Sequence, residues 1–214
     1  MRMENVGPVS YDSVTLTGAF TVYKSDINIE HLSMHAIKSE DALNIIGSNY
    51  FMNDCFFQDT NSDAIDIDYS NGKITKCEFN NIGILGGGDA ADFSGSLSSI
   101  SESVFKVISD KAISAGERSN IEVSGVAVYS ASVGLASKDG SSVNIHNSVF
   151  SNITYSPIIA YMKKKEFTGG TINSYETKVD EFRSIFCDEH STIIFDGRII
   201  KKEKILVKEL YNSI

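Results

Sequence analysis

Short apolar stretches alternate with single polar residues along most of the chain, and polar turns interrupt them every few residues. In the segment Asp63-Ala64-Ile65-Asp66-Ile67 the large apolar residues fall at every second position. A period of two is expected of β-strands and argues against amphipathic helices. Gly, Ser and Asn between the stretches mark turns. The pattern therefore predicts an all-β protein built from many short strands.

The same segment recurs at a nearly constant spacing. Copies begin at Asp41, Asp63, Asp89 and Asp110, and a copy without the leading Asp begins at Gly134. Each copy is followed by a second short strand that ends in a small residue and, in most copies, an aromatic. The small residues are Cys55, Cys77, Ser103, Val126 and Ser148, spaced 22, 26, 23 and 22 apart. The interval of 26 contains the insertion 84–88. A period near 22 predicts a solenoid whose coils pair strand upon strand at about 4.8 Å.

We expect about six coils, and we assign residues 1–161 to a parallel β-helix. Residues 162–214 are expected to form a C-terminal extension that caps it, with a hairpin at Asp196-Gly197 and a weakly helical segment from Lys201 to Ile214. The alternation predicts four interior columns: Leu43, Ile65, Ala91, Ile113, Leu135; Ile45, Ile67, Phe93, Ala115; Leu32, Cys55, Cys77, Ser103, Val126, Ser148; and Met34, Phe57, Phe79, Phe105, Val128, Phe150.

Segments 63–68, 110–119 and 133–141 resemble right-handed parallel β-helix proteins of the pectate-lyase-like superfamily. More narrowly, they resemble the β-helix found downstream of a spore-coat-type kinase-like domain in some bacterial surface proteins. The resemblance covers about residues 18–160. It implies a right-handed, single-stranded parallel β-helix and a chain that is the C-terminal portion of a longer protein. The superfamily mixes lyases, hydrolases, epimerases, adhesins and non-catalytic modules, so the fold leaves the activity open.

The candidate chemistry lies on an acidic column. If Ile65 and Ile67 point inward, Asp66 and Asp68 point outward, and Asp92 lies one coil on from Asp66. Carboxylates stacked at about 5 Å repel each other unless a cation, a shared proton or hydrogen-bond donors lie between them. We therefore predict Asp66 and Asp92 as a catalytic acid–base pair, and Asp66, Asp68 and Asp92 as ligands of a divalent cation. Lyases of the resembling superfamily hold Ca²⁺ with such carboxylates, which makes calcium the implied cofactor.

Three further residues are predicted to bind substrate: Tyr69, Arg118 and Lys138. Tyr69 offers a ring on which a sugar could stack. Arg118 and Lys138 are the cations that a lyase would need as a base, but counting coils places them two or more coils from the acidic column.

Other polar residues have simpler predicted roles. The leading Asp of each repeat (Asp41, Asp63, Asp89 and Asp110) is expected to cap its own turn through its side chain. Cys55 and Cys77 share an interior column and are expected to be buried, reduced thiols.

Charge and targeting signals narrow the function classes. The 28 Asp and Glu against 19 Lys and Arg give a net charge of −9, which disfavours nucleic acid and anionic lipid as partners. No stretch approaches the roughly 20 apolar residues of a transmembrane helix, and no signal peptide is visible. The default location is the cytoplasm, or a cell surface if the chain belongs to a longer protein.

Two functions stay open. The first is a carbohydrate-associated β-helix that binds or processes a surface or extracellular polysaccharide, as a lyase or glycoside hydrolase if it is an enzyme. The second is a non-catalytic structural or protein-interaction module. An open end of the solenoid would present unpaired strand edges, which favour homo-oligomers in either case.

Overall fold

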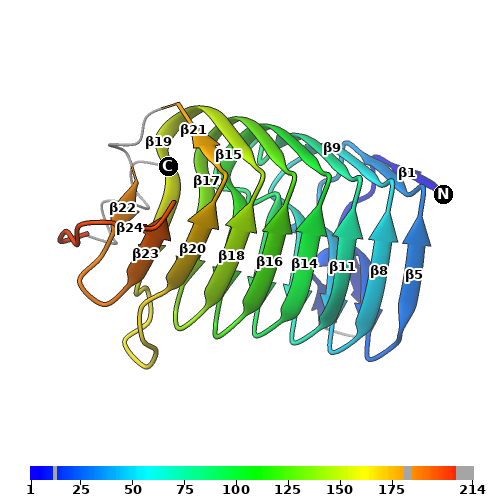
Figure 1. Cartoon of the computed structure of the whole chain (residues 1–214). Coiled ribbons are helices and arrows are strands. Elements are labelled where there is room, and N and C mark those ends of the chain that lie inside the picture. The colour runs from blue at the N-terminus through cyan, green and yellow to red at the C-terminus, as the bar shows by residue number, and fades with distance from the viewer. Residues whose placement is uncertain (12–13, 181–184, 206–214) are drawn as a thin grey trace.

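The computed structural model describes residues 1–11, 14–180 and 185–205. Strands and turns make up these residues, and no helix occurs among them. Parallel strands stack coil upon coil from the N-terminal end to the C-terminal end, which confirms the predicted all-β parallel solenoid (Figure 1).

Each coil contributes strands to three faces, which we number in chain order. The first face contains β4 (Gly18–Tyr23), β7 (Asp41–Ile46), β10 (Asp63–Asp68) and β13 (Ala91–Ser94). The second face contains β5 (Ile27–Glu30), β8 (Asn49–Asn53), β11 (Asn71–Thr75), β14 (Leu97–Ser101), β16 (Asn120–Ser124), β18 (Ser142–His146), β20 (Thr171–Tyr175) and β23 (Thr192–Phe195). The third face contains β6 (Ser33–His35), β9 (Phe56–Thr60) and β12 (Glu78–Ile82), with β1 (Arg2–Glu4) paired to β6.

Three long strands cross from the third face to the first without a break. They are β15 (Val104–Gly116), β17 (Ala127–Lys138) and β19 (Val149–Tyr161). The first part of β15 pairs with β12, and its last part pairs with β13. The first and third faces are therefore one bent, 13-stranded sheet.

The solenoid has about eight coils, so the expected six is too low. Eight parallel strands follow one another on the second face, from β5 to β23. Two of them, β20 and β23, lie after Tyr161, and the short strands β21 (Lys178–Val179) and β22 (Phe186–Cys187) pair with β19. The stacking thus continues into residues 162–214, the segment that we expected to form the C-terminal extension and cap.

The C-terminal hairpin is confirmed. Strand β24 (Arg198–Ile199) pairs with β23 in antiparallel fashion around Asp196 and Gly197, both of which have positive φ. No helix is present over residues 201–205, and the rest of the predicted helix lies outside the described residues. At the other end, β2 (Val9–Tyr11) and β3 (Val14–Leu16) form a separate antiparallel hairpin.

All four predicted interior columns are buried. In the aromatic column the rings of Phe57, Phe79 and Phe105 stack in parallel, with centroids 5.2 and 4.8 Å apart. Cys55 and Cys77 are buried free thiols in the neighbouring column. Strand register therefore places like residues directly above one another, and this buries a continuous apolar core.

A column of buried serines, here called the serine ladder, lies at the corner between the first and second faces: Ser48, Ser70, Ser96, Ser119 and Ser141. The backbone N–H at the same corner of the preceding coil donates to each hydroxyl oxygen at 3.0 to 3.1 Å. Four of these hydroxyls in turn donate to a carbonyl of their own turn. The ladder therefore satisfies the backbone polar groups that the sharp corner removes from the sheets.

Candidate functional site

The predicted acidic residues lie on the outward side of β7, β10 and β13. Asp66 of β10 is the direct register partner of Asp92 of β13, and Asn44 of β7 lies on the other side of Asp66. The expected neighbourhood of Asp66 and Asp92 is thus confirmed. Adjacent strands lie about 4.8 Å apart, so the two carboxyl groups belong to neighbouring coils.

Lys138 reaches this site, contrary to the distance expected from counting coils. Its Nζ lies 2.8 Å from Ser114 Oγ and 3.5 Å from Asp92 Oδ1. The lysine stem crosses Gly116, where a Cβ would come within 2.8 Å of Lys138 Cε. The missing side chain at Gly116 therefore gives the long lysine a path over one coil toward Asp92.

The environments of Asp92 and Asp66 move their pKa values in opposite directions. Burial alone would raise the pKa of Asp92, but the Lys138 cation, the Ser114 hydroxyl and the Lys111 cation lower it below its usual value. Burial and the nearby carboxylates of Asp68, Asp41 and Asp92 raise the pKa of Asp66 to about 9. At neutral pH, Asp66 is therefore a neutral acid beside an ionised Asp92.

Asp66 belongs to a group of carboxyl groups that we call the carboxylate cluster: Asp41, Asp63, Asp66, Asp68 and Asp92. Burial is the largest cause of the raised pKa of Asp41, to about 6, and of Asp63, to about 8. Burial also raises the pKa of Asp68. At neutral pH the protonated forms of Asp63 and Asp66 reduce the repulsion that full ionisation of the cluster would cause.

The amide of Asn44 ties the cluster together. Its Nδ2 donates to Asp66 Oδ2 at 3.0 Å and to Asp68 Oδ2 at 3.5 Å. Asn44 Oδ1 and Asp41 Oδ2 are buried and have no hydrogen-bond partner in the part of the chain that the structure describes. The sequence interpretation missed Asn44, although its place in the repeat, one period before Asp66, was visible.

Two of the leading Asp residues, Asp63 and Asp89, act between coils and not within their own turns as expected. The backbone N–H of Asp89 donates to Asp63 Oδ1 at 2.8 Å, and that of Lys111 donates to Asp89 Oδ1 at 3.0 Å. The reason is geometric: the repeat places a backbone N–H of the next coil within reach of these two carboxylates. These bonds do at this corner what the serine ladder does at another.

The predicted substrate residues separate into two groups. Tyr69 follows Asp68 directly and is 66% exposed, and a Cβ on Gly95 would come within 2.8 Å of its ring. Its hydroxyl lies 3.5 Å from Glu117 Oε2. Arg118, by contrast, lies over the ring of Phe167, with 5.3 Å between the guanidinium carbon and the ring centroid. The structure therefore places Tyr69 and Lys138 beside the acidic residues and Arg118 against Phe167.

The metal site stays a prediction. Within residues 1–11, 14–180 and 185–205, no group of three or more His, Cys, Asp or Glu side chains is arranged to hold a metal ion. Asp66, Asp68 and Asp92 remain the predicted ligands of calcium. The same part of the chain contains no helix that could span a membrane.

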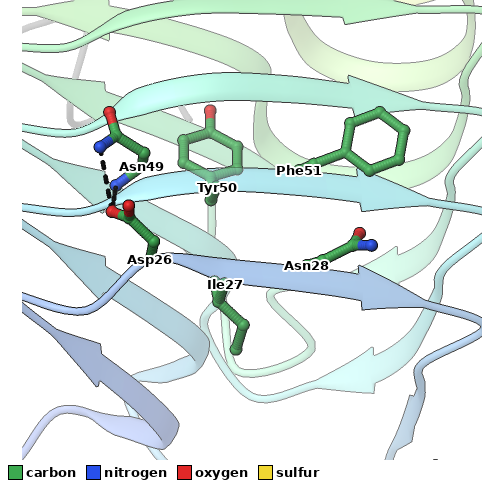
Figure 2. A pocket seen from close by; sticks show the side chains of 6 residues that line it. All are labelled: Asp26, Ile27, Asn28, Asn49, Tyr50 and Phe51. Carbon is green, nitrogen blue, oxygen red and sulfur yellow. Dashed lines mark hydrogen bonds between the residues drawn. The ribbon is translucent and has the colours of Figure 1, made fainter.

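A shallow depression of about 420 Å³ lies elsewhere, at the N-terminal end of the second face (Figure 2). It is lined by Asp26, Ile27, Asn28, Asn49, Tyr50 and Phe51. Asp26 Oδ1 accepts hydrogen bonds from the backbone and side-chain nitrogens of Asn49 at 3.1 and 3.0 Å. None of the predicted site residues lines this depression.

Comparison with known proteins leaves the family open. No family model matches the sequence, and no curated protein is significantly similar to it. Among solved structures, the chain is weakly similar to trypsin-treated QnrB1, a plasmid-mediated fluoroquinolone resistance protein. The match has 10% identity and a TM-score of 0.23, and it covers 82% of this chain and 90% of that one. A TM-score of this size supports no inference about fold or function.

Proposed function

We propose that the chain is a carbohydrate-processing solenoid that cleaves a polysaccharide on its first face. The observation that carries the proposal is the register pair Asp66 and Asp92, whose surroundings keep one carboxyl group protonated and the other ionised. Neighbouring carboxyl groups with separated pKa values are typical of acid–base pairs in enzymes. Membership of the pectate-lyase-like superfamily and origin in a spore-coat-type kinase-like surface protein are further parts of the proposal, and they rest on the sequence resemblance.

In this proposal Asp66 is the general acid and Asp92 the base or nucleophile. A glycosidic oxygen is a poor leaving group until it is protonated, and Asp66 holds the proton. Lys138 keeps Asp92 ionised, which either nucleophilic attack or activation of water requires. Carboxyl groups separated by about one strand spacing favour a retaining mechanism, because an inverting enzyme needs roughly 6.5–9.5 Å to admit a water molecule.

The surroundings suit an extended sugar chain. Tyr69 presents an exposed ring directly after Asp68, and stacked strands offer a repeating surface along the solenoid axis. Calcium held by Asp66, Asp68 and Asp92 would neutralise the carboxylates and orient a uronate, which would favour a lyase reaction instead. Arg118 would then have to leave Phe167 to take part.

The test is a panel of neutral and uronate polysaccharides, incubated with the chain with and without millimolar Ca²⁺. We expect new reducing ends on at least one substrate, and Asp66→Asn or Asp92→Asn should lower the rate by about 100-fold or more. Asp54→Asn, at an exposed corner where Asp54 pairs with His31, is the matched control and should keep the rate. Unsaturated products that require Ca²⁺ would identify a lyase, whereas saturated products would identify a hydrolase.

The second candidate is a non-catalytic interaction module. The observation that favours it is the pair of strands β4 and β5, which end the first and second faces at the N-terminal end of the solenoid. Edge strands invite pairing with another chain. This candidate would be favoured if the wild-type protein neither bound nor cleaved any polysaccharide and if its mass in solution increased with concentration. Binding without turnover would instead indicate a lectin-like module.

A further inference from the structure

A buried lysine lies between two aspartates beside the carboxylate cluster. Lys111 Nζ is 2.5 Å from Asp110 Oδ2 and 3.2 Å from Asp89 Oδ1. The side chains are only 3%, 7% and 8% exposed for Lys111, Asp110 and Asp89. We call these three residues the Lys111 triad.

Burial makes the charged form of the triad expensive. Each ion loses its hydration, and the mutual attraction of the charges offsets this free-energy penalty only in part. A lysine and two aspartates also leave one negative charge in excess when all three are ionised. A neutral bond between the amine and one carboxyl group would remove two of the three buried charges.

Asp89 is held and polarised as an acceptor for attack. The backbone N–H of Lys111 donates to Asp89 Oδ1 at 3.0 Å, so the same oxygen faces both the amine and a fixed hydrogen-bond donor. The backbone N–H of Asp89 donates to Asp63 Oδ1 at 2.8 Å, which anchors Asp89 on the neighbouring coil. A fixed donor at the carboxyl oxygen is the arrangement that stabilises negative charge developing during attack on a carbonyl carbon.

Asp110 is placed to move protons. It contacts the amine directly, and burial together with the Asp89 charge raises its pKa to about 6, although Lys111 acts in the opposite direction. A carboxyl group with a pKa near neutrality both accepts and returns a proton efficiently. The triad thus contains a nucleophile, a polarised carboxyl group and a proton carrier within contact distance.

We propose that Lys111 and Asp89 condense into an intramolecular isopeptide bond, with Asp110 as the proton carrier. Asp110 takes a proton from the Lys111 ammonium and passes it to the Asp89 carboxylate, and the freed amine attacks Asp89 Cγ. A tetrahedral intermediate forms, Asp110 carries a second proton from the amine nitrogen to the departing hydroxyl, and water leaves while Asp110 is ionised again. One C–N bond forms, one C–O bond breaks, and the ammonium and carboxylate become an amide and one water molecule without any oxidant or reductant.

The bond would join two neighbouring coils covalently. Lys111 and Asp89 are 22 residues apart, one full period of the solenoid. The strands of a solenoid pair only with those of neighbouring coils, so a covalent cross-link of this kind would resist separation of the stack at this point.

Intact-protein mass spectrometry of the purified, folded chain tests the proposal. We expect a mass lower than that of the sequence by one water, about 18 Da. Trypsin should fail to cut after Lys111, and peptides 77–106 and 107–118 should appear as one branched species. Fragment ions should place the branch at Asp89 and not at Asp92.

Two variants and a control complete the experiment. Lys111→Arg keeps the positive charge but removes the nucleophilic amine, and Asp110→Asn removes the proton carrier, so both should have the full sequence mass. Lys106→Arg, on the same strand and paired at the surface with Glu78, should retain the loss of water. A folded wild-type chain with the unshifted mass, cleaved normally after Lys111, would overturn the proposal whether or not the variants fold.

Discussion

Single serines provide the hydrogen-bond acceptors for buried backbone N–H groups at the corners of the solenoid. Each member of the serine ladder accepts an N–H from one coil and belongs to the next, so the same hydroxyl serves two coils. At a buried corner water cannot replace it. The cost of losing one hydroxyl is therefore the cost of an unpaired buried donor, not that of an average hydrogen bond.

Ser96→Ala tests this account. It leaves the backbone N–H of Ser70 without its acceptor, and we expect the free energy of unfolding to fall by about 1–3 kcal/mol. Chemical denaturation measures the loss. Ser99→Ala, on the outward side of β14, should change the stability by less than about 0.5 kcal/mol. Equal losses in the two variants would contradict the role of the ladder.

Reading the sequence identified these serines only as turn residues. A serine in a turn usually bonds to its own backbone, and nothing in a single repeat shows that the next coil lies within reach. The contact between Lys138 and Asp92 was not predicted for a related reason. Counting coils gives the distance between backbones and not the reach of a long side chain. The four-carbon stem of Lys138 crosses Gly116, and only the register of the strands shows that these two residues are neighbours.

Strands β7, β10 and β13 concentrate acidic side chains on one outward surface. The raised pKa values of Asp63 and Asp66 mean that the folded chain holds protons that the unfolded chain releases near pH 4. Between about pH 4 and pH 9 the folded state therefore binds more protons than the unfolded state, and stability falls as the pH rises.

We predict that the melting temperature falls as the pH is raised from about 5 to about 9. Asp66→Asn imitates the neutral acid, so its melting temperature should depend less on pH over the same range. Calorimetry at a fixed ionic strength compares the two proteins. A wild-type melting temperature that rises through this range would show that the cluster is not protonated in the folded state.

At the scale of strands the sequence was a reliable guide wherever alternation was strict. The period of two correctly assigned the interior columns, including the stacked rings of Phe57, Phe79 and Phe105. It also placed Asp66 and Asp92 side by side. Bonds between coils, such as that from Asp89 to Asp63, could not be derived, because they depend on how two turns stack and not on the pattern within either one.

The whole molecule is longer in coils than the repeat suggested. Strands β20 and β23 continue the second face, but the coil around them lacks the leading Asp and the aromatic residue of the earlier repeats. Terminal coils of solenoids are commonly atypical, since they face solvent instead of a further coil. The recognisable sequence repeat therefore ends before the last coils of the structure.

Because the corners are regular, we expect this protein to change its length only by whole coils. Ser119 and Ser141 are equivalent and 22 residues apart, and Asn120 is the register partner of Ser142. Removing residues 120–141 would bring Ser142 directly after Ser119, so that β18 takes the place of β16 with every corner intact. We expect this shortened chain to fold with a β-sheet circular dichroism spectrum and a cooperative melt, whereas removal of residues 120–130 should abolish both. Insertion or deletion of entire coils would then be tolerated, whereas insertion or deletion of part of a coil would prevent the chain from folding.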